Sequence, residues 1–271
     1  MALALLGKLL LDRVRVIGFS CNMKTYSLLL ASLDQTIGRH ALEEASTAVP
    51  SVARADCARL QRELFGILAS GLPLDQARAF QAELGKRNFP TELVADCDLP
   101  VLHESFQIQR IERRGEVLTL TDSMGHERAK PLTDLVFLAA GYLHRLQFKT
   151  EWHQHLDFGS GRHGGMPKLV TEREFAEETE LEFRLDFFFW AEPNRLHAAL
   201  GKKTAIFHQG KPLRLKDAGG LRDLASAMAG LLPPKRLNAF LHDPDSRPFY
   251  PNLASYEKEI RWHFHQLKAR G

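Results

Sequence analysis

Histidines gather in one short segment, residues 152–168. His153, His155 and His163 fall within eleven positions, and Asp157 lies between them. Imidazole nitrogens and carboxylate oxygens are common ligands of zinc and related metals, so these four residues suggest a metal-assisted enzyme as one hypothesis. No H-E-x-x-H pattern completes such a site, and residues at i and i+2 share a face only on a strand. With 12 histidines in the chain, a surface loop with a chance cluster is the simpler interpretation.

The same segment contains a glycine-rich stretch, GSGRHGG, at residues 159–165. Glycines let backbone amides approach a phosphate, and an arginine can pair with it. A P-loop would need Lys followed by Ser or Thr, and a dinucleotide site would need a helix directly afterwards, whereas Met166 and Pro167 follow here. We therefore expect an exposed loop. If it contacts a ligand, four residues are the candidates: Arg162, His163, Gly164 and Lys168.

The rest of the chain offers few patterns typical of catalysis. Cys21, Cys57 and Cys97 are widely spaced and form no C-x-x-C pair, so we expect core packing in a reduced, cytoplasmic setting rather than a zinc knuckle or a disulfide framework. There is no G-x-S-x-G motif and no cysteine beside a plausible histidine. A non-catalytic protein without a cofactor is therefore favoured over an enzyme.

A third hypothesis concerns the basic and aromatic C-terminal stretch. Its side chains could stack on bases and contact phosphates if a helix exposed them. Packing of Trp262 on the preceding β domain is the more usual role for such a helix. The residues concerned are Tyr256, Lys258, Arg261, Trp262, His263 and His265.

Composition limits the class of protein. The chain has 271 residues, 44% hydrophobic and 25% charged, with a net charge of +3. These values fit a folded globular protein, and the balanced charge makes nucleic acid or an anionic membrane an unlikely main partner. No apolar run reaches the length of about 18 residues that a transmembrane helix needs. Lys8 splits the apolar start, so residues 1–22 are expected to be an extension rather than a signal peptide.

The first part of the chain alternates strands and helices. An apolar run at 26–33 predicts a strand, and apolar residues at helical spacing follow as far as Pro50. A strand is predicted at 64–72, then a helix opened by Pro73, and a further strand at 89–96. This order predicts a ferredoxin-like α/β sandwich over residues 23–98.

The stretch GILASGLPLDQARAFQAELGKRNFPTELV carries a family resemblance. In this segment a strand leads into a helix and then into a turn before "FP", which resembles half of a SPOR-type domain over about residues 64–95. That resemblance implies binding of peptidoglycan glycan chains. Because residues 1–22 do not fit an export signal, peptidoglycan is not the expected partner.

The pattern changes after Asp96. Asp98, Leu99 and Pro100 are typical of a linker, so a domain boundary is expected between Asp96 and Ser105. Short strands are then predicted at 106–111, 116–121, 127–130 and 135–140. The segment LTLTDSMGHERAKPLTDLVFLAAG resembles the opening hairpins of a pleckstrin-homology-like barrel over about residues 106–141. That resemblance implies an antiparallel barrel with a closing helix.

One strand, residues 181–190, has the clearest pattern in the chain. Phe183, Leu185, Phe187 and Phe189 are expected to be buried, and Glu182, Arg184 and Asp186 to face solvent, because the two sets alternate. A preceding run of glutamates at 172–182 is expected only to be solvated. Helical patterns follow from 217 and from 253. Residues 104–271 are thus predicted to form an antiparallel β domain with C-terminal helices.

Together these features predict an α+β protein with two domains. The favoured function is a non-catalytic binding or adaptor protein, with regulation as one role it could serve and a protein or small molecule as its partner. The sequence identifies neither the partner nor the oligomeric state.

Overall fold

The computed structural model describes residues 24–157, 168–191, 194–208, 211–213, 225–230, 232–243 and 249–269. Helices and sheets are both present, in agreement with the predicted α+β class. The expected N-terminal extension, Cys21 and the glycine-rich loop at 159–165 lie outside the described residues. No described helix has both the length and the apolar character that crossing a membrane requires.

The N-terminal lobe, residues 24–98, is built on a three-stranded sheet. Its strands are β1 (Tyr26–Leu30), β2 (Ile67–Leu72) and β3 (Thr91–Ala95), in the order β2-β1-β3. The central β1 runs antiparallel to both neighbours. Three helical elements connect β1 to β2, and a fourth joins β2 to β3. They are α2 (Arg39–Ser46), η2 (Arg54–Asp56), α3 (Cys57–Arg62) and α4 (Leu74–Gly85).

Helix α4 illustrates how the sequence forms this lobe. Pro73 precedes the helix, where its missing N–H costs nothing, and Ala77, Phe80 and Leu84 then recur at helical spacing. These three side chains are fully buried in the lobe's core. Cys57 is also buried there, as expected, whereas Cys97 is exposed, so the core-packing prediction was wrong for it. Cys97 lies in η3 (Asp96–Asp98), after the last strand of the lobe has ended.

A large mixed sheet forms the second lobe, residues 104–269. The strand order is β11-β7-β8-β9-β4-β5-β6, with β10 paired to β9. Strands β9 and β4 run parallel, as do β11 and β7, and the other pairs are antiparallel. Among the described strands this sheet stays open, with β11 at one end and β6 at the other. Its strands are β4 (Phe106–Arg114), β5 (Val117–Thr121), β6 (Glu127–Pro131), β7 (Leu135–Asp157), β8 (Lys168–Ala191), β9 (Asn194–His208), β10 (Lys211–Leu213) and β11 (Phe249–Tyr250).

Short helical elements lie beside this sheet. They are η4 (Leu132–Asp134), η5 (Pro234–Arg236) and α6 (Ala239–His242). Residues 99–105 join the two sheets without forming a helix or strand, in the interval where the domain boundary was expected.

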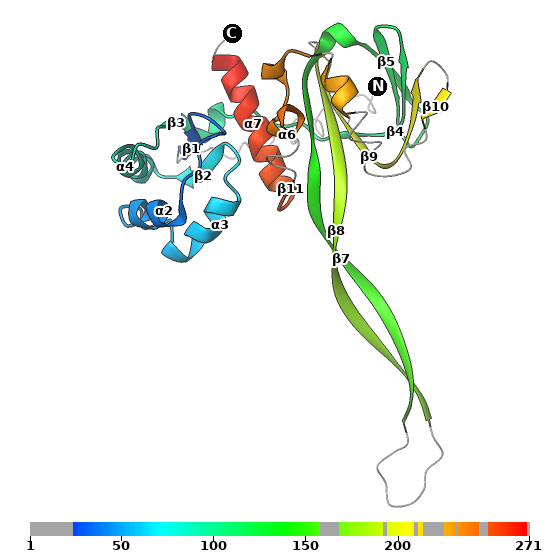
Figure 1. The fold of residues 1–271 in the computed structure, drawn as a ribbon, viewed down its shortest axis with the longest axis horizontal. Coiled ribbons are helices and arrows are strands. Elements are labelled where there is room, and N and C mark those ends of the chain that lie inside the picture. Colours follow the sequence, from blue (N-terminus) through cyan, green and yellow to red (C-terminus); the bar gives the residue numbers. More distant parts are fainter. Residues whose placement is uncertain are drawn as a thin grey trace, which may run out of the picture.

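Strands β7 and β8 form a ribbon that projects from the body of the protein (Figure 1). Their antiparallel register runs from Leu135 opposite Phe189 to Asp157 opposite Lys168. Residues 152–157 are therefore strand, and the surface-loop interpretation was wrong for them. The reason is that cross-strand pairing with β8 extends farther than the local apolar pattern indicates.

Strand β8 is buried on both faces where it crosses the body. Phe183, Leu185, Phe187 and Phe189 are buried, as predicted from their alternation. The prediction for the opposite face was wrong for two of its three residues: Asp186 is 0% exposed, and only 18% of the Arg184 side chain is exposed, whereas Glu182 is partly exposed. The C-terminal helix covers this face. Alternation within the strand cannot predict such a contact, because the helix is far away in the sequence.

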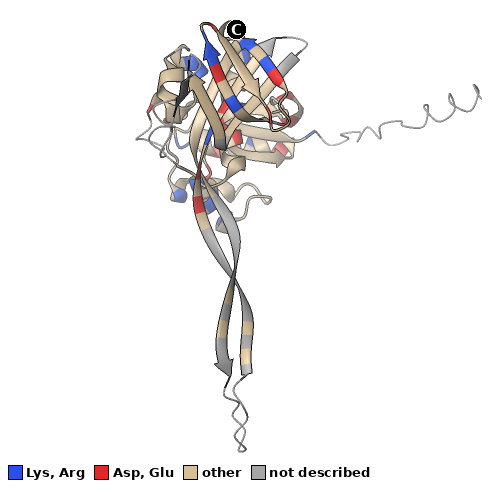
Figure 2. Ribbon diagram, turned by 90° about the vertical axis from the view of Figure 1, so that its right-hand side faces the viewer, with Lys and Arg blue, Asp and Glu red and all other residues tan. Residues whose placement is uncertain are grey.

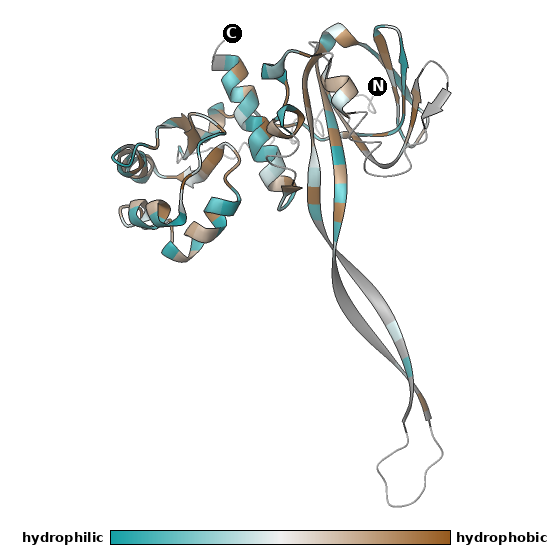
Figure 3. Cartoon of the chain, in the orientation of Figure 1, coloured by the Kyte–Doolittle hydropathy of each residue, from teal (hydrophilic) through white to brown (hydrophobic). Residues whose placement is uncertain are grey.

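Helix α7 (Leu253–Ala269) lies between the two sheets (Figure 1). Tyr256, Ile260 and Phe264 pack on the large sheet. Trp262 points the other way, into a cluster of the N-terminal lobe, and its Nε1 donates to the carbonyl oxygen of Leu30 at 2.7 Å. The expectation that Trp262 packs on the β domain was therefore wrong. Figure 3 shows hydrophobic positions among hydrophilic ones along this helix. Its apolar side chains contact the large sheet on one face and the N-terminal lobe on the other.

A glycine permits the close approach of α7 to the N-terminal lobe. Gly66 has φ +78°, and a Cβ built on it would lie 2.5 Å from the Cβ of Trp262. Gly71 has nearly the same backbone angle, φ +75°, but open space around it. The two glycines therefore separate the cost of a left-handed backbone from the cost of crowding the indole.

We expect Gly66→Ala to destabilise the protein more than Gly71→Ala. Both substitutions place a side chain in the left-handed region, at a cost of about 1–2 kcal/mol. Crowding against Trp262 should add about 1–3 kcal/mol for Gly66→Ala alone. Denaturant unfolding measures both values. The excess should shrink when Trp262→Ala is present in both proteins, because that change removes the Cγ and Cδ1 contacts and leaves the Cβ contact. Equal losses in the two single variants would show that α7 does not dock as described.

Candidate functional site

A buried carboxylate lies at the contact between the large sheet and α7. The Arg184 guanidinium donates to both carboxylate oxygens of Asp186, through Nε at 2.7 Å and Nη2 at 3.0 Å. His197 Nε2 lies 2.6 Å from Oδ1, and the Tyr256 hydroxyl donates to Oδ2 at 2.8 Å. Four close contacts from three elements thus satisfy this carboxylate.

Strand geometry explains how these residues meet. Arg184 and Asp186 are two positions apart on β8, so they project from the same face. His197 lies on the neighbouring β9 opposite Phe188, and its ring stacks on that phenyl ring at 4.4 Å between centroids. Tyr256, from the first half of α7, completes the group.

Charge and burial shift the pKa values in this group. Burial acts to raise the pKa of Asp186, but the hydrogen bond from His197 and the positive charge of Arg184 outweigh it and lower that pKa. Burial acts to lower the pKa of Arg184, whereas the adjacent Asp186 raises it, and the net direction is upward. Burial raises the pKa of Tyr256 well above its ordinary value, and the charge of Asp186 adds to this.

His197 is fully engaged by this arrangement. Its Nδ1 lies 2.9 Å from the backbone oxygen of His103, and its Nε2 faces Asp186. Both ring nitrogens are directed at oxygen atoms of the protein, so neither faces a molecule bound in the neighbouring space. In this geometry His197 links β9 to Asp186 on β8 and to the backbone of His103, and its ring lines the neighbouring space rather than acting as a general base.

A second buried network holds α7 to strand β7. The side chain of Asn238 pairs with both backbone groups of Ala140: Oδ1 accepts from its N–H at 3.1 Å, and Nδ2 donates to its oxygen at 2.8 Å. Asn238 Nδ2 also donates to the Tyr250 hydroxyl, which donates to Glu259 Oε2 at 2.9 Å. Glu259 Oε1 accepts from the Ala239 N–H at 2.7 Å. These contacts fix α6, β11 and α7 on one side of the sheet.

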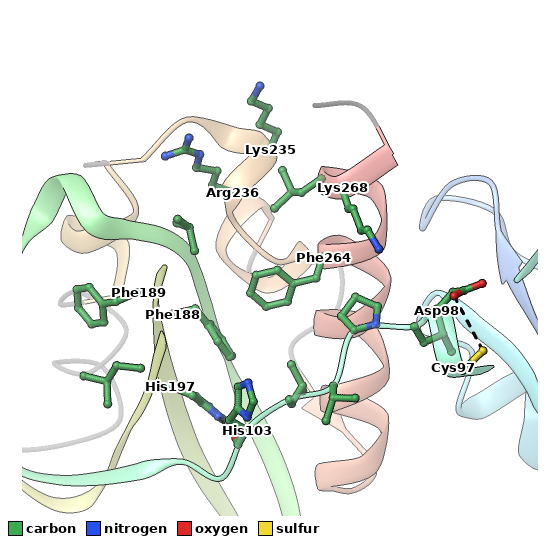
Figure 4. A pocket seen from close by; sticks show the side chains of 17 residues that line it. Cys97, Asp98, His103, Phe188, Phe189, His197, Lys235, Arg236, Phe264 and Lys268 are labelled. Atoms are coloured by element: carbon green, nitrogen blue, oxygen red, sulfur yellow. Dashed lines mark hydrogen bonds between the residues drawn. The ribbon is translucent and has the colours of Figure 1, made fainter. Parts of the chain in front are cut away.

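A cavity of about 690 Å³ lies beside the Asp186 network, among the large sheet, the end of α7 and the segment that joins the lobes (Figure 4). Its lining is mainly apolar. Phe188, Phe189 and Leu196 come from the sheet, and Phe264 and Leu267 from α7. Leu99, Pro100, Val101 and Leu102, from the joining segment, also line it.

The charged side chains of this cavity are mostly basic. Lys235 and Arg236 belong to η5, and Lys268 to the last turn of α7. His103 and His197 also line the cavity, and Asp98 is the acidic member of the lining. Figure 4 shows Lys235 and Arg236 beyond Phe264 on one side, whereas Lys268 extends toward the side of Asp98 and Cys97. The site is a preformed apolar space with cations at its margin.

Arg162, His163 and Gly164 lie outside the described residues. Lys168 pairs with Asp157 at the far end of the described ribbon, and their side chains are not described. His155 comes two positions after His153 on β7, and Glu172 lies opposite His153 in the register; the side chains of these three residues are not described either. Among the side chains that the structure does describe, no group of three potential ligands could hold a metal.

The aromatic side chains of the C-terminal stretch are largely occupied. Tyr256 is 1% exposed and Trp262 8% exposed, so neither can stack on a base in this arrangement. Lys258 lies 3.7 Å from Glu63, and His265 lies 3.0 Å from Glu92, both across the contact with the N-terminal lobe. In the view of Figure 2, acidic and basic positions are interspersed over the body.

Sequence reasoning did not identify the cavity because its residues come from six separate stretches of the chain. One local signal was available. The consecutive Phe187, Phe188 and Phe189 cannot all project from one face of a strand, so this run indicates a strand covered on both sides. No local pattern indicates that Lys235, Arg236 and Lys268 meet at one opening.

Comparison with protein-family models, with curated proteins and with solved structures found no match to this chain.

We expect Asp186→Asn to cost about 3–5 kcal/mol of folding stability, because it leaves the buried Arg184 charge without its partner. Asp56→Asn is the matched control, because it breaks an exposed pair with Arg59 and should cost less than about 1 kcal/mol. Unfolding in denaturant measures both, and similar losses would contradict the buried network.

The stability of the native protein and that of Asp186→Asn should also depend differently on pH. The pKa of Asp186 is lowered on folding, so its stabilising effect is present above the unfolded value of about 3.9 and is lost as pH falls from there through the folded value. The stability difference between the native protein and Asp186→Asn should therefore shrink in acid. A difference that stays constant down to the acid limit would mean that Asp186 is not ionised in the folded protein.

Proposed function

We propose that this chain is a non-catalytic binding protein whose ligand is a small organic molecule held in the cavity between the sheet and α7. The observation that carries the proposal is the cavity itself. Its volume of about 690 Å³ lies within the range of about 300–1,000 Å³ typical of small-molecule sites, and its apolar lining with few polar groups is characteristic of them.

The position of the cavity supports a regulatory role for such binding. The segment that joins the two lobes forms one wall, and α7, which contacts both lobes, forms another. A ligand in contact with both walls stabilises the arrangement in which they enclose it. Binding would therefore favour one arrangement of the lobes, which is how an adaptor could report a small molecule to a partner.

The fold offers two further points of comparison. In the N-terminal lobe, β2 and β3 flank an antiparallel β1 and are connected by α4, which is the strand–helix–strand arrangement of half a ferredoxin-like sandwich. We extend the proposal to a ferredoxin-like and SPOR-type relationship for this lobe. A pleckstrin-homology-like relationship is proposed for the second lobe, supported by the consecutive antiparallel strands β4, β5 and β6.

Metal binding on the ribbon is the second candidate function, and one observation favours it. The register pairs His153 with Glu172 across the ribbon, and His155 follows two positions later on β7; imidazole and carboxylate groups are a donor set suited to zinc. Zinc-loaded, desalted protein should then hold one equivalent of metal by elemental analysis, and His153→Ala/His155→Ala should hold none. His40→Ala/His126→Ala, which removes two exposed histidines elsewhere, is the control. Equal metal content in all three proteins would exclude this site.

For the cavity, we expect Leu267→Trp to weaken binding of a neutral fluorescent probe, N-phenyl-1-naphthylamine, by about tenfold or more. The indole would occupy space that the probe needs. A probe that can no longer bury part of its aromatic surface loses about this much affinity. Leu253→Trp is the control, because it makes the same change on the exposed first turn of the same helix. Fluorescence titration gives both affinities. Absence of probe binding to the native protein, or equal affinity in both variants, would overturn the proposed function.

A further inference from the structure

The cavity has an apolar body and a basic margin, and these two parts imply different portions of one ligand. We propose that the ligand is an amphiphile with a single anionic head, such as a long-chain carboxylate, whose head binds beside Lys235 and Arg236 and whose chain lies against Phe188, Leu196 and Phe264. This inference rests on the proposed function and specifies its ligand class.

The body of the cavity favours an apolar chain over a polar molecule. Phe188, Leu196 and Phe264 are each less than 9% exposed and contribute only carbon atoms through their side chains. The polar atoms of the nearby His197 ring are turned to His103 and Asp186, so the ring presents its carbon edge and face. A polar molecule placed here would lose its water without gaining hydrogen bonds from these side chains.

The cations of η5 are available for an anionic head. Among the described residues, neither Lys235 nor Arg236 has an ion-pair partner, although 11 pairs between other Lys or Arg side chains and carboxylates are formed across these parts of the chain. A guanidinium binds a carboxylate through two parallel hydrogen bonds, and the neighbouring ammonium adds a second positive charge. Both side chains lie on the same side of Phe264 (Figure 4), so a head between them leaves the chain directed into the apolar body.

Lys268 is a weaker candidate for the head. It belongs to the last turn of α7, where the free carbonyl groups give the helix end a partial negative charge. Figure 4 shows it directed toward the side of the cavity that holds Asp98, a carboxylate that repels an anion. The electrostatics therefore favour the η5 side and predict that the two ends of the cavity are not equivalent.

The test compares ligands that share a chain and differ in the head: dodecanoate, dodecanol and dodecyltrimethylammonium, each below its micellar concentration. Displacement of N-phenyl-1-naphthylamine from the full chain reports their affinities. Dodecanoate should bind about tenfold or more tightly than dodecanol, and the cationic ligand should bind weakest, because one charge-assisted contact has an effect of this size.

Charge variants identify the position of the head. Lys235→Gln/Arg236→Gln should weaken dodecanoate by about tenfold and leave dodecanol unchanged. Arg62→Gln/Arg78→Gln removes the same net charge from exposed positions of the N-terminal lobe and should leave both affinities unchanged. Lys268→Gln should have a smaller effect than the η5 double variant.

Failure of this inference is distinct from failure of the proposed function. If the probe binds and Leu267→Trp weakens it, but dodecanol equals or exceeds dodecanoate, the cavity is a binding site and the anionic head is wrong. The same conclusion follows if the control double variant weakens dodecanoate as much as Lys235→Gln/Arg236→Gln, because general charge would then explain the preference. If the probe does not bind at all, both the inference and the proposed function fall.

Discussion

The ionised carboxylate of Asp186, buried between sheet and helix, is the constraint on which much of this structure depends. An isolated buried carboxylate is strongly unfavourable, so Arg184, His197 and Tyr256 must reach it together. These partners come from β8, β9 and α7, which requires the helix to lie at one position on the sheet. The apolar contacts of Ile260 and Phe264 stabilise that position, but such contacts are non-directional. The hydrogen bonds to the carboxylate are directional, so they determine where on the sheet the helix lies.

Once α7 is fixed on the large sheet, its opposite side determines where the N-terminal lobe sits. Trp262 enters the cluster that includes Leu29, Ile67 and Val94, and Gly66 leaves room for the indole. The lobes are therefore connected twice, through residues 99–105 and through α7. The cavity lies where these two connections and the large sheet meet, so its shape depends on the arrangement of the lobes.

The same network also determines which chemistry is available in the cavity. A histidine beside an apolar pocket and hydrogen-bonded to an aspartate resembles a catalytic pair, but the second ring nitrogen of His197 faces a backbone carbonyl rather than the pocket. A base needs one nitrogen free for its substrate. The arrangement of His197 is therefore one reason why we propose a binding role for the cavity.

The sequence by itself determined the α+β class, the strand–helix–strand order of the N-terminal lobe and the buried set on β8, because helical and strand periodicities record which side of each element is apolar. It did not determine what covers the other face of that strand. Asp186 and Arg184 have the spacing of solvent-facing residues, and Trp262 has the spacing of a residue that packs on its own domain. Only the tertiary structure decided these positions, since the burial of Asp186 and the meeting of Lys235, Arg236 and Phe264 depend on residues up to 70 positions apart, whose contacts leave no local pattern.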